Sequence, residues 1–326
     1  METDFLIQTL SSIVAASAPV VLASMGETIS EKGGVINLSL DGSIALSAMT
    51  GFAVALTTGS LVVGIGAAMM VGAFIALIIA FASITLRQEQ VAVGFVLTML
   101  CTDLADFLGN PFVRQQGPSM PPLPIPYLSD IPILGPILFD HSLLIYVSML
   151  IVVAAWWWIY KTQPGLKLQG VGERPESAFA RGVNVNRLRY IYTMVGGALV
   201  GLAGASYSLS IKLGWSHRHT FGIGWIALAI VIFGGWSPWR AAAGCYLFGF
   251  LKALGSILQR NPAFAKVPTQ IFSSAPFALM IFALLLLNSE GVDRLLALLP
   301  PRLARSVDRI IRGRSPGGLG RPFTQE

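Results

Sequence analysis

Residues 42–86 read GSIALSAMTGFAVALTTGSLVVGIGAAMMVGAFIALIIAFASITL, which is 45 residues without a charged side chain. A helix that crosses a lipid bilayer needs about 20 predominantly apolar residues. This stretch can therefore hold two membrane-spanning helices, and a soluble fold has no simple use for it. The whole composition agrees, because 54% of the 326 residues are hydrophobic and only 12% are charged, against about a quarter in soluble domains.

Hydropathy along the rest of the chain predicts about nine spans, with a range of roughly eight to ten. The expected fold class is therefore all-α, a polytopic transmembrane helical bundle within residues 1–290. Near residues 30–45, Gly, Asn and Ser predict a broken or re-entrant helix, because irregular backbone is tolerated at membrane depth only inside protein or beside water. The predicted spans are 5–25, 35–56, 61–86, 91–108, 142–160, 190–210, 222–236, 241–258 and 271–288.

The basic residues predict an orientation. If the loop 161–189 faces the cytoplasm, nine spans place 16 of the 22 Lys and Arg residues on the cytoplasmic side and 5 outside. Cytoplasmic loops carry such an excess, so we expect the N-terminus outside and the C-terminus in the cytoplasm. Residues 291–326 then form a basic cytoplasmic tail. It lacks interleaved aromatic residues, so it is expected to meet membrane lipid and no nucleic acid.

Motifs for bond chemistry are absent from the sequence. It contains no G-x-x-x-x-G-K-[ST] phosphate loop, so the chain cannot be an ATPase by that route. It also contains no G-x-S-x-G and no H-E-x-x-H, so an intramembrane hydrolase lacks its signature. His217 and His219 form an H-x-H pair without a neighbouring Cys or acidic cluster, which favours a solvated loop over a metal site. We therefore expect no catalytic, cofactor-binding or metal-binding residues.

Ionisable residues inside predicted spans are candidates for a transport role. Asp103 and Asp106 lie near the outer end of the fourth span, and Lys252 lies toward the outer part of the eighth. For Lys252, snorkelling of the side chain toward the interface is the favoured interpretation. A carboxylate near the midplane, typical of ion-coupled transporters, is not evident from the predicted boundaries. This favours an energy source outside the chain.

Two loops are long enough to interpret. Residues 109–141 contain eight prolines and cannot form a regular helix; they are either a rigid spacer or a docking surface for an external partner. In the loop 161–189, Pro175 suits the first turn of a helix, Glu176 suits its positive end, and Gly182 suits its stop. A helix of about two turns is marginal alone in water, so we expect it to sit in a partner's groove.

Two segments carry a family resemblance. The first reads SEKGGVINLSLDG (residues 30–42), and the second reads VGERPESA (171–178) and continues with GVNVNR (182–187). Both resemble permease subunits of ABC importers in the branched-chain amino acid and simple-sugar permease superfamily, most closely its nucleoside and simple-sugar branch, over about residues 10–290. The chain departs from that branch where Leu38-Ser39 replaces Ile-Gly, Asp41 replaces Glu and Arg174 replaces Asn.

The resemblance implies a transport subunit of a bacterial cytoplasmic (inner) membrane, not an enzyme, that moves a small polar solute inward by alternating access. Its implied partners are an ABC ATPase, a second permease subunit that is identical or homologous, and an external substrate-binding protein. Alternatives are a branched-chain amino acid permease of the same architecture, an ion-coupled secondary transporter or channel, and a membrane-embedded enzyme.

The resemblance also implies two sets of functional residues. The ATPase-coupling loop would comprise Gly172, Glu173, Arg174, Pro175, Glu176, Ala178, Phe179, Arg181 and Gly182. The translocation path would include Gly34, Asn37, Ser39 and Asp41. For Asn37 and Asp41, capping of a helix end remains an open alternative.

Overall fold

The computed structural model describes residues 2–260 and 315–323, with a few single positions between them. Within these residues the chain is almost entirely helical, and its only extended pairings are two isolated bridges. The α-helices are α1 (Glu2–Lys32), α2 (Leu40–Thr58), α3 (Leu61–Ala80), α4 (Gln90–Gly109), α5 (Leu143–Lys161), α6 (Gln163–Glu173), α7 (Pro175–Ala180), α8 (Val185–Ser206), α9 (Ile223–Phe233) and α10 (Pro238–Arg260). The shorter turns are η1 (Phe81–Thr85), η2 (Asn110–Phe112), η3 (Gly135–Phe139) and η4 (Tyr207–Ile211).

The polytopic helical bundle is confirmed, but the count of nine spans is not supported. Among the described residues, seven helices are long and apolar enough to cross a membrane: Asp4–Lys32, Leu40–Thr58, Leu61–Thr85, Gln90–Phe112, Leu143–Lys161, Val185–Ile211 and Pro238–Gln259. The predicted seventh span, 222–236, contains only α9, whose 11 residues extend about 16 Å, half of a bilayer core. The predicted ninth span, 271–288, lies outside the described residues.

The first span is longer than expected, and a break follows it. Helix α1 continues to Lys32, seven residues beyond the predicted end at residue 25. Residues 33–39 are not helical, and α2 begins at Leu40, so the chain does break within the predicted region 30–45. The hydropathy estimate ended the first span before the carboxylates of its last turns.

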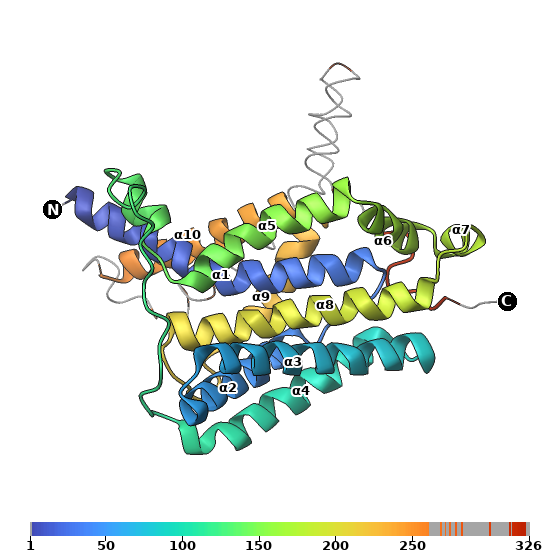
Figure 1. Ribbon diagram of the computed structural model, residues 1–326, viewed down its shortest axis with the longest axis horizontal. Coiled ribbons are helices and arrows are strands. Elements are labelled where there is room, and N and C mark those ends of the chain that lie inside the picture. The colour runs from blue at the N-terminus through green and yellow to red at the C-terminus, as the bar shows by residue number, and fades with distance from the viewer. Residues whose placement is uncertain are drawn as a thin grey trace.

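Helix α8 lies at the centre of the bundle and packs against α1, α2 and α3 (Figure 1). Small residues permit this close approach, as is common between membrane helices. A methyl group at Gly26 would lie 2.4 Å from the carbonyl oxygen of Gly196, and one at Gly72 would lie 2.2 Å from that of Gly197. The backbones of α1, α3 and α8 are therefore in direct contact.

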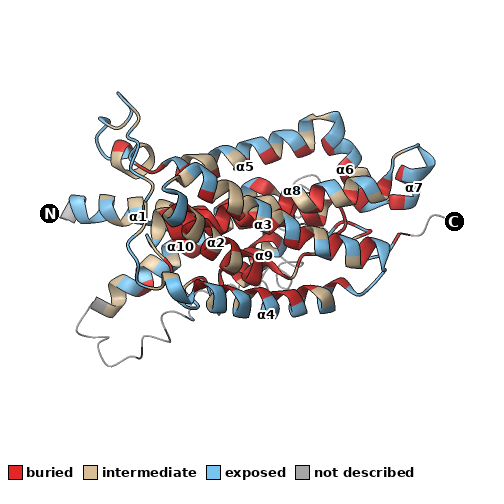
Figure 2. Cartoon of the chain, turned by 60° about the horizontal axis from the view of Figure 1, so that its bottom comes forward, coloured by how far each residue is buried: buried red, intermediate tan, exposed pale blue. Residues whose placement is uncertain are grey.

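Helices α2 and α8 form the interior, whereas α4 and α5 form the periphery. In the most apolar part of α2 and of α8, 67% of the residues are buried, against 28% in α4. Figure 2 shows the outward faces of α4 and α5 as largely exposed. Large apolar side chains lie there, among them Phe107 at 78% and Leu150 at 65% exposure. These faces suit contact with lipid or with another membrane subunit.

Candidate coupling loop and buried polar segment

The irregular segment 33–39 has its backbone polar groups satisfied by side chains from neighbouring helices. The N–H of Ile36 donates to Gln90 Oε1 at 2.8 Å. The N–H of Asn37 donates to Glu27 Oε1 at 2.9 Å, and Thr98 Oγ1 donates to the carbonyl of Leu38 at 2.8 Å. Because unpaired backbone groups are costly in a membrane, these bonds from α1 and α4 explain how the break is stable.

The four predicted path residues are brought together here, and all of them are buried. The Asn37 side-chain oxygen accepts bonds from the N–H and the hydroxyl of Ser39, at 3.1 and 2.6 Å. Ser39 Oγ is also 3.0 Å from Ser43 Oγ. Asn37 is 2% exposed and Ser39 is fully buried, so in this conformation their polar groups stabilise the start of α2.

Asp41 connects the beginnings of two helices. It lies in the first turn of α2, and its carboxylate accepts bonds from the N–H groups of Gly224 at 2.9 Å and Gly222 at 3.2 Å. Those glycines stand at the start of α9, so the carboxylate occupies the positive end of that helix as well as of its own. Discontinuous helices whose N-termini meet within the membrane are a known way to build a polar site there.

Glu27 and Glu31 were not among the residues predicted from the sequence, because the predicted first span ended at residue 25. Both are buried on α1, one helical turn apart. Glu27 binds the Asn37 backbone, and Glu31 accepts a bond from Trp236 Nε1, just after α9. The signal was present as two carboxylates at i and i+4 after an apolar run, but the first span was drawn too short to include them.

The loop 161–189 forms two helices separated by Arg174. Helix α7 has Pro175 in its first turn, and Gly182 follows its end at φ +80°, a conformation that glycine adopts readily. The predicted short helix and both of its boundary residues are therefore confirmed. Glu173 and Arg174, at the junction, are exposed.

The predicted coupling residues divide into a buried and an exposed set. Gly172, Pro175 and Ala178 are buried against the rest of the chain. The others are exposed: Glu173, Arg174, Glu176, Phe179, Arg181 and Gly182. A shallow groove of about 430 Å³ runs between α6 and α7. The arrangement presents charged side chains and one aromatic ring on a short, well-anchored helix.

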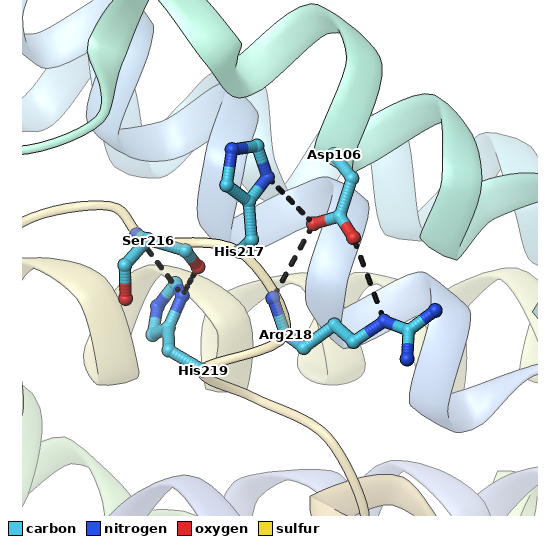
Figure 3. Close-up of polar contacts among 5 residues, drawn as sticks. All are labelled: Asp106, Ser216, His217, Arg218 and His219. Atoms are coloured by element: carbon cyan, nitrogen blue, oxygen red, sulfur yellow. Dashed lines mark hydrogen bonds and ion pairs between the residues drawn. The ribbon is translucent and has the colours of Figure 1, made fainter.

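At the opposite end of the bundle, Asp106 holds the loop that leads into α9 (Figure 3). Its carboxylate accepts the Arg218 N–H at 3.3 Å and lies 3.4 Å from His217 Nδ1. The ring of His219 turns away and contacts the Ser216 carbonyl at 2.5 Å. Burial lowers the pKa of His219, against the opposing effect of that carbonyl. The two histidine rings therefore contact different partners, His217 the Asp106 carboxylate and His219 the Ser216 carbonyl.

The remaining ionisable candidates are exposed. Asp103, one turn before Asp106 on α4, and Lys252 on α10 both lie on the outside of the chain. Among the residues that the structure describes, no three His, Cys, Asp or Glu side chains lie close enough together to hold a metal ion.

Comparison with known proteins gives a family match over most of the chain. The family described as the permease component of branched-chain amino acid transport systems matches residues 9–284. A putative glucose ABC transporter permease of Haloferax volcanii is 37% identical over 75% of this chain and 76% of its own length. No solved structure matches the chain.

Two further relatives are named as nucleoside transporters. A guanosine ABC transporter permease of Bacillus subtilis is 35% identical over 86% of this chain and 92% of its own. A nucleoside ABC transporter permease of Lactococcus lactis is 31% identical over 88% and 95%.

Proposed function

Because the chain belongs to the family of permease components of branched-chain amino acid transport systems, and is an ABC importer permease and not an enzyme, we propose that its solute is a nucleoside or a simple sugar. The names of the three relatives support this substrate class. A branched-chain amino acid is the alternative solute. To distinguish these solutes, uptake of labelled solute is measured in the presence of unlabelled guanosine, glucose or leucine as a competitor. Inhibition by leucine alone would contradict the proposal.

The loop helix α7 is the proposed seat for the ATPase. The observation that supports this proposal is that α7 has only six residues, too few for a helix to be stable in isolation. Its buried face packs against the rest of the chain, while Glu176, Phe179 and the following Arg181 are exposed. In an alternating-access cycle, closure of the ATPase pair would displace α7 as a rigid body and shift the bundle between its two open states.

The segment with Gly34, Asn37, Ser39 and Asp41 is the proposed lining of the solute path. Buried amide, hydroxyl and carboxylate groups at a break in the bundle suit a polar solute. Since these groups bond to one another and to α9 in this conformation, the solute would reach them only after the N-termini of α2 and α9 separate.

Glu27 and Glu31 bear on the energy source. A buried carboxylate pair in the last turns of α1 is compatible with an ion-coupled transporter, so that alternative stays open. Coupling to ATP rests instead on the family. The proposed partners are an ABC ATPase, a second permease subunit and an external substrate-binding protein.

The proposed location is a bacterial cytoplasmic membrane, with the N-terminus outside and the C-terminus inside. Residues 1–290 would form the membrane domain and residues 291–326 the basic tail. The six Lys and Arg residues of the loop 161–189 support a cytoplasmic position for that loop. The C-terminal residues 317 and 318 bond to this loop, and α1 ends beside it at Lys32, which supports the C-terminus inside and the N-terminus outside.

The seat of the ATPase is tested by charge reversal on α7. Glu173 is unsuitable because its carboxylate also accepts the Gly317 N–H at 3.2 Å, so we choose the double variant Glu176→Lys with Arg181→Glu. Like charges brought together at an interface cost several kcal/mol, so the ATPase should no longer copurify. Arg187→Ala, exposed on α8, is the control. Wild-type copurification and uptake in the double variant would contradict this seat.

A further inference from the structure

A short glycine-rich segment near the C-terminus, residues 316–323, lies across the loop 161–189 and the break after α1. We call it the tail strap. The Gly318 N–H donates to the Gly172 carbonyl at 2.7 Å, and the Gly317 N–H donates to Glu173 Oε2 at 3.2 Å. The strap is thus joined by its backbone to the junction between α6 and α7.

The middle of the strap binds the irregular segment. The Gly320 N–H donates to the Gly34 carbonyl at 3.1 Å. Gly34 has φ +89°, and a methyl group there would meet the Arg189 guanidinium at 2.8 Å. The conformation and the close approach both require glycine at this position.

Arg189 of α8 binds the tail strap through hydrogen bonds to its backbone carbonyls. It is 2% exposed, and its Nη1 and Nη2 donate to the carbonyls of Arg321 at 3.0 Å and Gly318 at 3.4 Å. Burying a guanidinium is costly unless it is hydrogen-bonded. The strap therefore supplies acceptors that this part of α8 needs.

The far end of the strap is anchored by Phe323. This side chain is 7% exposed and packs with the buried residues Val171, Ala178 and Val185. Its ring centroid lies 5.7 Å from that of Phe179 on α7. The anchor therefore lies where α6, α7 and α8 meet, three residues beyond the bond to Gly34, and its contacts with Ala178 and Phe179 are on the helix proposed to receive the ATPase.

We propose that the tail strap is the mechanical link through which displacement of α7 reaches residues 33–39 and opens or closes the solute path. This inference rests on the proposed function of α7. One continuous piece of backbone is fixed to α7 by Phe323 and to the break by Gly320. A movement of the helix pulls directly on the segment that carries Asn37 and Ser39, in addition to any movement of the spans.

The two ends of the strap can be disturbed separately. Phe323→Ala removes the anchor on α7, and truncating a buried Phe shifts a docked equilibrium by about a hundredfold or more. Gly320→Pro removes the N–H that Gly34 accepts and cannot adopt φ +73°. Arg321→Ala is the matched control, because its side chain is exposed and its carbonyl is retained.

The assay uses the whole transporter, copurified with its ATPase and reconstituted in proteoliposomes with the binding protein. We expect both end variants to copurify normally and to hydrolyse ATP within about twofold of wild type. Solute moved per ATP should fall about tenfold or more, a change of about 1.4 kcal/mol. Arg321→Ala should match wild type.

Four other results would contradict either this inference or the proposed function. If Phe323→Ala alone loses coupling while Gly320→Pro keeps it, Phe323 only supports α7, and the link is refuted. Loss of the ATPase from either variant makes the strap a docking element and also overturns the inference. Full coupling in both variants refutes it as well. A wild-type complex that fails to use ATP would instead refute the proposed function.

Discussion

Replacing Asp41 by Asn should destabilise the protein, because this carboxylate bonds α2 to the start of α9. Its Oδ1 accepts from Gly224 at 2.9 Å and its Oδ2 from Gly222 at 3.2 Å. An Asn of the same shape keeps one acceptor and turns an NH₂ toward the other N–H. Asp41→Asn therefore loses at least one bond to a charged acceptor.

The expected size follows from that bond. A hydrogen bond to a charged group contributes about 1.5–3 kcal/mol, and position at a helix N-terminus adds to the preference for an anion. On the scale of about 2–4 °C per kcal/mol, the loss lowers the midpoint of thermal unfolding by roughly 3–12 °C. Asp41→Leu removes both acceptors and should lower it further.

Thermal unfolding of the purified protein in detergent measures this effect. Ser47→Ala is the control on the same helix, because the Ser47 hydroxyl is buried and has no hydrogen-bond partner among the described residues. Removing such a group is close to neutral, so its midpoint should stay within about 1 °C of wild type. Equal midpoints for Asp41→Asn and wild type would refute the junction of α2 with α9.

Three further outcomes are expected. Gly72→Ala on α3 should lower the free energy of unfolding by about 1–3 kcal/mol, because its methyl group would lie 2.2 Å from the backbone of α8. Gly66→Ala on the same helix is the control, because its methyl group meets nothing within 4 Å. Equal losses of stability in the two variants would contradict the α3–α8 contact. Asn37→Leu should lower the rate of solute uptake more than the yield of assembled transporter, and unchanged uptake kinetics would favour a purely capping role. Asp106→Ala removes the acceptor for the Arg218 N–H and should speed tryptic cleavage in residues 212–222; an unaltered cleavage rate would show that Asp106 does not hold this loop.

The long apolar spans and the short helix α7 could be predicted because their signals are local. Composition decides whether a span exists, and Pro175 with Gly182 marks the ends of α7 within eight residues. The family could be inferred from the two motifs for the same reason. What these patterns cannot reveal is which distant groups pair with them.

The sequence-based predictions failed where contacts between residues far apart in the chain decide the structure. Helix α9 was read as a span because its sequence is apolar, but its start is fixed within the bundle by Asp41, about 180 residues earlier. Glu27 and Glu31 lie beyond the predicted end of the first span at residue 25, and their partners, the Asn37 backbone and Trp236, are identified only in the folded chain. The tail strap carries a weak sequence signal, since most of its bonds are made by the backbone.

As the permease of an ATP-driven importer, this chain should move solute only when a partner ATPase hydrolyses ATP. The most direct test measures solute uptake by proteoliposomes that contain the purified complex, with ATP supplied inside the vesicles, with ATP supplied outside them, and without ATP. We expect an ABC ATPase to copurify with the chain and solute uptake to stop when ATP hydrolysis is blocked. A chain that purifies without any ATPase and takes up the solute on an ion gradient alone would contradict it.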